Sequence, residues 1–202
     1  MKKVFACMLA LTMLLSCAAL ADQNENGEFV FRGGVQWGMT RDGVMSREGI
    51  DASSDSVTEY KLPARLMDVA AVQISGVSAA GVQAELTYIF ADGLLVGAEY
   101  VFDSAVITLE QLRLSLHELY GNSLILNRTR LEEALSGLTE SDEAAEEQLQ
   151  RIISGCNSAW ECPATYIVLM TREDESAYMI LYLGEDVLAA QIRASKINTD
   201  GL

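Results

Sequence analysis

The chain has 202 residues, half of them hydrophobic, and carries a formal net charge of −15. A surface this acidic repels phosphate backbones and anionic lipid head groups, so nucleic-acid binding is disfavoured. Cationic molecules and other proteins are the expected partners, although charge of this sign also serves solubility alone.

Residues 1–21 have the parts of a secretory signal peptide. Lys2 and Lys3 precede an apolar run, and Ala19 and Ala21 form the small-residue pattern of a cleavage site. The run is too short for a membrane span. We therefore expect an exported protein, whose mature chain would carry 12 basic and 29 acidic residues and a net charge of −17.

A second processing site overlaps the first. The residues before Cys17, Leu-Leu-Ser, resemble a bacterial lipobox, in which the cysteine becomes the lipid-modified first residue. Lipid anchoring at Cys17 and plain secretion after cleavage at Ala21 both remain open. If Cys17 is lipidated, only the lipid would reach the membrane, and the polar residues 22–28 would form a short tether. Residues 29–202 are long enough for a single domain with one core.

The first half, residues 29–103, predicts one helix followed by about three strands. Thr40 is a good N-cap, and a helix over Arg41–Glu48 would end at Gly49. Extended segments are predicted at Val57–Leu62 and over residues 67–75.

A β-hairpin is predicted over residues 82–102, where apolar residues alternate on both sides of Asp92-Gly93. A two-residue turn there would place the apolar face of one strand beside the mixed face of the other. A three-residue loop over 91–93 keeps the apolar side chains together. The predicted pairs are Phe90 with Leu94, Tyr88 with Val96, Leu86 with Ala98 and Ala84 with Tyr100.

The second half, residues 104–202, repeats the order of helices and then strands. Capping boxes at Thr108 and Thr129 each predict a helix, and a third is predicted over residues 142–153. Three strands are then predicted, over residues 164–171, 177–183 and 187–192. We predict an α+β fold in which an antiparallel sheet of two three-stranded halves carries its helices on one face.

The stretch 31–44 carries a resemblance to known families. Its Trp37-Gly38-Met39-Thr40 turn and following helix resemble outer-membrane assembly lipoproteins of the SmpA/OmlA type and the β-lactamase-inhibitor-like fold. Gly43 departs from this pattern, where a helix former is expected. The resemblance implies a helix packed on an antiparallel sheet in a non-enzymatic binding module, and it transfers no functional residue.

Cys156 and Cys162 are the two cysteines beyond the signal region. Export and the even count predict a disulfide between them. Their spacing is not that of a zinc knuckle, and the single histidine, His117, is distant in sequence, so neither a metal nor a cofactor is predicted.

No nucleophile motif accompanies His117, and we expect this residue at the surface without a catalytic role. The leading interpretation is a non-catalytic exported or lipid-anchored cell-envelope module that binds another protein. Two alternatives stay open. One is a small exported enzyme or a metal- or ligand-binding protein that uses acidic side chains, and the other is an inhibitor of a secreted enzyme.

Overall fold

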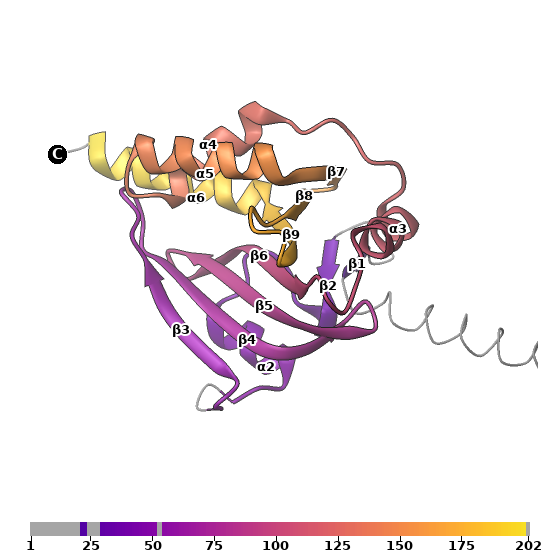
Figure 1. Cartoon of the computed structure of the whole chain (residues 1–202). Helices are drawn as coiled ribbons and strands as arrows, with labels where there is room; N and C mark the ends of the chain where they lie inside the picture. Colours follow the sequence, from indigo (N-terminus) through magenta and orange to yellow (C-terminus); the bar gives the residue numbers. More distant parts are fainter. Residues whose placement is uncertain (1–20, 24–28, 52–53, 201–202) are drawn as a thin grey trace, which may run out of the picture.

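The computed structural model describes residues 21–23, 29–51 and 54–200. Cys17 and most of the predicted signal peptide and tether lie outside these residues. The α+β fold is confirmed: helices lie on a seven-stranded antiparallel sheet with the strand order β3-β4-β5-β6-β9-β8-β7 (Figure 1). Strand β6 pairs with β9, so the two halves of the chain form one continuous sheet.

The elements follow one another along the chain with these bounds: β1 Ala21–Gln23, β2 Phe29–Phe31, the 3-10 helix η1 Arg32–Gly34, α2 Arg41–Glu48, β3 Val57–Leu62, β4 Val69–Ala79, β5 Val82–Ala91, β6 Leu94–Asp103, α3 Leu109–Tyr120, α4 Arg128–Leu138, α5 Asp142–Gly155, β7 Cys156–Cys162, β8 Thr165–Thr171, β9 Ala177–Gly184 and α6 Glu185–Asp200.

Local capping positions the early helices as predicted. The Thr40 side chain accepts a hydrogen bond from the N–H of Gly43, and Gly49 ends α2 in the left-handed conformation. Thr108 and Gln111 form a reciprocal capping box at the start of α3. The sequence alone is sufficient to predict these caps, because each capping bond joins residues within one helical turn.

Two predicted elements differ in the second half. Asn127, not Thr129, caps α4, because the Asn127 side chain accepts from the N–H of Arg130 at 3.3 Å. Residues 187–192, predicted as a strand, lie in α6. Strand β7 takes the third strand position instead.

The hairpin of β5 and β6 has a different register from the predicted one. Asp92 and Gly93, with φ of 47° and 79°, form a two-residue turn. A β-bulge beside Ile89 then shifts the pairing. The observed pairs are Ala91 with Leu94, Phe90 with Leu95, Tyr88 with Ala98 and Leu86 with Tyr100. The predicted loop is wrong, but the bulge serves the same physical requirement by keeping Leu86, Tyr88, Ala98 and Tyr100 in one core.

The helices lie on both faces of the sheet, not on the single face predicted. Along β8, Ile167 and Leu169 join the core that contains α2 and α3, whereas Tyr166, Val168 and Met170 join a core with α4 and α5. Successive strand residues point to opposite faces. Figure 1 accordingly shows α4, α5 and α6 apart from α2, with the sheet between them.

The Trp37 to Thr40 turn has a structural role. The Trp37 indole N–H donates to Thr165 Oγ1 at 2.7 Å. The N–H of Gly38 donates to the Leu95 carbonyl at 2.9 Å, and the Leu95 N–H donates to the Met39 carbonyl at 2.9 Å. The turn therefore fixes α2 to the β5–β6 hairpin.

Candidate functional site

Helices α4 and α6 lie side by side and run in the same direction. At one end, the Arg130 guanidinium lies 3.4 Å from a Glu185 carboxylate oxygen. Seven residues further along each helix, Ile192 packs against Gly137, where an added Cβ would lie 2.5 Å from Ile192 Cγ1. The two contacts fix the spacing of the helices at both ends.

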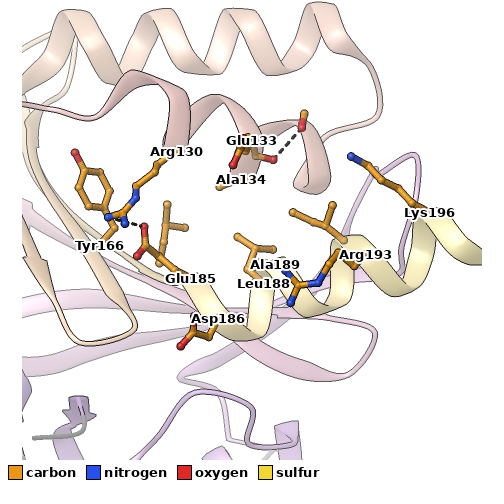
Figure 2. A pocket seen from close by; sticks show the side chains of 13 residues that line it. Arg130, Glu133, Ala134, Tyr166, Glu185, Asp186, Leu188, Ala189, Arg193 and Lys196 are labelled. Atoms are coloured by element: carbon orange, nitrogen blue, oxygen red, sulfur yellow. Dashed lines mark hydrogen bonds and ion pairs between the residues drawn. The ribbon is translucent and has the colours of Figure 1, made fainter.

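Between these contacts lies a cavity of about 420 Å³, which we call the α4–α6 cleft (Figure 2). Its size falls in the range of small binding pockets. Its lining residues are Arg130, Glu133, Ala134, Ser136, Tyr166, Leu183, Glu185, Asp186, Leu188, Ala189, Ile192, Arg193 and Lys196.

The floor of the α4–α6 cleft is apolar. Leu183 at the end of β9 and Leu188 of α6 are both buried. Ala134 and Ala189 face each other across the cleft from α4 and α6, and both are half-buried. Because both side chains are small, they leave room between the helices.

Charges of both signs surround this floor. The Arg130 guanidinium donates a hydrogen bond to the Glu161 carboxylate at 2.5 Å and also pairs with Glu185. The bond to Glu161 raises the pKa of Arg130. Within the described part of the chain, the side chains of Glu133, Asp186 and Arg193 make no hydrogen bond or ion pair. The rim therefore offers free charges of both signs, shown at its edge in Figure 2.

Tyr166 and Glu185 lie at the end of the cleft near Arg130. The Tyr166 hydroxyl accepts a hydrogen bond from the Asn127 N–H at 2.5 Å, which joins β8 to the start of α4. Burial raises the pKa of Tyr166. Burial also raises the pKa of Glu185, and Arg130 partly opposes this change. The end of the cleft near Arg130 is thus partly shielded from water.

The predicted disulfide between Cys156 and Cys162 is not formed. They lie at opposite ends of β7. An extended strand rises about 3.3 Å per residue, which separates the two by roughly 20 Å, whereas a disulfide needs Cα atoms within about 7 Å. The even count of cysteines predicts the disulfide, but the extended strand keeps the two residues apart.

The other residues considered for chemistry stay apart. His117 lies exposed on α3 with Nδ1 3.0 Å from the Gly121 carbonyl oxygen. Among the described residues, no group of three or more His, Cys, Asp or Glu side chains could hold a metal ion.

A second cavity, of about 380 Å³, lies between α5 and the sheet, with Glu99 of β6 among its lining residues. We call it the Glu99 pocket. The sequence prediction did not single out Glu99. A signal was present, because Glu99 is the one charged residue within the apolar run of Leu94–Phe102, and such runs are typical of strands covered on both faces.

Comparisons with protein-family models, with curated protein sequences and with solved structures found no match. The resemblance of residues 31–44 to outer-membrane assembly lipoproteins stays a prediction. Among the helices of the described residues, none is both long and apolar enough to span a membrane.

Proposed function

We propose that this protein is a non-catalytic, exported or lipid-anchored cell-envelope module that binds another protein through the α4–α6 cleft. One observation carries the proposal: a single cleft combines an apolar floor with free rim charges of both signs. The predicted signal peptide supports a role outside the cytoplasm.

The rim charges favour a protein over other partners. Glu133 and Asp186 supply free carboxylates, while Arg193 supplies a free cation, counting only partners within the described residues. Nucleic acids and anionic lipid surfaces present mainly negative charge. A protein surface presents both signs, so it can complement all three side chains.

The apolar floor of the α4–α6 cleft supplies the hydrophobic contact with the partner, and the charged rim surrounds this contact. Protein interfaces have an apolar centre and a polar rim, with arginine and tyrosine enriched at the positions that contribute most. Arg130 and Tyr166 lie at one end of the cleft, beside buried Leu183 and Leu188. An apolar side chain of the partner would fill the space between Ala134 and Ala189.

Affinity capture from cells that make the protein tests this proposal with a matched pair of substitutions. Ala189→Trp fills the cleft, whereas Ala194→Trp adds the same side chain to an exposed position of α6 outside it. We expect the wild type and Ala194→Trp to retain the same partner. We expect Ala189→Trp to retain at least about tenfold less, because it removes the central contact.

Circular dichroism of both variants checks that α6 still folds. The proposal is wrong if the folded Ala189→Trp variant retains the partner as well as the wild type does. It is also wrong if the wild type retains nothing beyond what an unrelated acidic protein retains.

A further inference from the structure

We propose that the Glu99 pocket binds an amphipathic organic cation, with an ammonium head at the Glu99 carboxylate and a hydrocarbon body along the apolar floor. This cavity differs from the α4–α6 cleft, although Leu183 lines both, and the proposal goes beyond the proposed function.

The floor of the pocket crosses the middle of the sheet. It is built by residues from five adjacent strands: Val69 of β4, Ile89 of β5, Glu99 of β6, Leu181 and Leu183 of β9, and Met170 of β8. Neighbouring strands lie about 4.8 Å apart, so this floor extends about 19 Å across the sheet. Glu99 lies on the central strand of this floor, opposite Leu181 of β9 on one side and opposite Thr87 of β5 on the other.

The pocket lies between two apolar clusters, both of which Ala134 of α4 contacts. One cluster contains Leu149, Ile152 and Met170, and the other contains Val69 and Leu188. A continuous core would cover this part of the sheet with hydrophobic side chains. Instead, the Glu99 carboxylate lies on this part of the sheet, and residues of α4 and α5 line the cavity above it.

The charges around the pocket favour a cation. Arg151 and Glu147 at the rim pair with each other at 2.6 Å and compensate each other. Glu140, also at the rim, has no partner among the described residues. Glu99 and Glu140 therefore leave the pocket negative, in a chain that already carries a net charge of −15.

Glu99 lacks a close partner of its own. No hydrogen bond or ion pair to its side chain occurs within the described residues, and Arg172 acts on it only through longer-range attraction. Burial raises the pKa of Glu99, and Arg172 partly opposes this rise. A carboxylate in such surroundings gains most from a ligand that brings a positive charge into contact with it.

Isothermal titration calorimetry of the purified protein tests the proposal with three probes. The probes are n-octylammonium, octanoate with the opposite charge, and n-propylammonium with a shorter hydrocarbon. We expect octylammonium to bind, octanoate to give no signal, and propylammonium to bind at least about tenfold more weakly because it buries less apolar surface.

Three variants locate the site. Glu99→Gln keeps the size of the side chain and removes its charge, so octylammonium should bind it at least about tenfold more weakly. Ala144→Phe, at the wall formed by α5, should block the pocket. Glu173→Gln removes the same charge from an exposed turn and should leave binding within about twofold.

The proposal is overturned if octylammonium does not bind, if octanoate binds equally well, or if folded Glu99→Gln binds octylammonium as the wild type does. These outcomes are independent of the partner-capture experiment, because the two residues substituted in that experiment, Ala189 and Ala194 of α6, do not line the Glu99 pocket.

Discussion

Ile192 of α6 occupies the space that a side chain on Gly137 of α4 would need. A Cβ built on Gly137 lies 2.5 Å from Ile192 Cγ1 and 2.6 Å from Cδ1, well inside van der Waals contact. This contact holds the two helices close at one end of the α4–α6 cleft. The width of the cleft therefore depends on the absence of a side chain at Gly137.

Gly137→Ala is predicted to destabilise the fold by about 1–3 kcal/mol through overpacking, despite the gain of about 1 kcal/mol in helix propensity. Urea denaturation measures the change. Adding Ile192→Ala should relieve the clash, so that the double variant is more stable than the sum of the two single effects implies. Gly43→Ala in α2 is the control, because its nearest contact is the Thr40 hydroxyl at 3.3 Å. An additive double variant would contradict the predicted contact.

A buried polar group under the sheet gives a second prediction. The Tyr88 hydroxyl donates to the Glu48 carboxylate, and Arg32 Nε pairs with that carboxylate at 3.1 Å. The Glu48 side chain is only 2% exposed, so loss of the tyrosine donor leaves a charged oxygen poorly satisfied.

Tyr88→Phe is therefore expected to reduce the free energy of unfolding by about 1–3 kcal/mol in urea denaturation. Tyr60→Phe on the edge strand β3 is the matched control. Tyr60 is 40% exposed and makes no hydrogen bond with the described residues, so its variant should stay within about 0.5 kcal/mol of wild type. Equal effects of the two variants would rule out the Tyr88 to Glu48 bond as a source of stability.

The two cysteines of β7 give a third prediction. Cys156 and Cys162 lie in one tryptic peptide, residues 152–172. After alkylation in denaturant without reductant, mass spectrometry should find both thiols of this peptide modified. In the native protein, Cys156 should react before the buried Cys162, although burial raises the pKa of the Cys156 thiol and slows it. A peptide with an internal disulfide would be incompatible with β7 as an extended strand.

Glu99 gives a pH-dependent prediction. Its pKa in the folded protein lies above the ordinary value of 4.5, chiefly through burial and against the pull of Arg172. Below the ordinary value, the group is protonated in both states and contributes no penalty. As pH rises toward the folded pKa, the unfolded chain releases its proton first, so ionisation favours unfolding.

The wild type should therefore lose stability relative to Glu99→Gln as the pH rises above 4.5, measured by urea denaturation at several pH values. The control variant Glu173→Gln measures how much the loss of one negative charge at an exposed position changes the free energy of unfolding. Arg151 and Glu147 also line the pocket, and their charges offset each other. The prediction is contradicted if the wild type gains stability relative to Glu99→Gln as the pH rises. That result would mean that the fold stabilises the ionised form of Glu99.

The parts of the fold that depend on neighbouring residues follow from the sequence. The caps of α2 and α3, the alternation in β5 and β6, and the apolar runs of β8 and β9 predict these elements because their signals are local. The register of the hairpin does not follow in the same way. Asp92-Gly93 favours a two-residue turn, and the bulge that corrects it is selected by the whole core.

The segment 187–192 shows how an apolar run misleads without its context. Its residues suit a strand, but Glu185 and Asp186 begin the same helix, where acidic side chains favour the N-terminal turn. Leu188 and Ile192, four residues apart, both face the core side of α6. The helical spacing of Leu188 and Ile192 is therefore present in the sequence, but an apolar segment that follows two strands also suits a third strand.

The α4–α6 cleft could not be predicted from the sequence. Arg130 and Glu185 are far apart along the chain and meet only because α6 returns across the sheet beside α4. Gly137 gave no signal of its own, since a glycine within a helix has many explanations. In contrast, Glu99 was recognisable as one charge in an apolar strand, and its pocket depends on the helices that cover it.

Site-specific photo-crosslinking tests the central claim most directly, because it detects contact at a chosen residue. A benzophenone side chain placed at Ala189, within the α4–α6 cleft, should form a covalent adduct with one protein partner in cells that make the chain. The same group at exposed Ala194 should not form that adduct. Adducts of equal yield at both positions, or none at Ala189 in the folded variant, would contradict partner binding in the cleft.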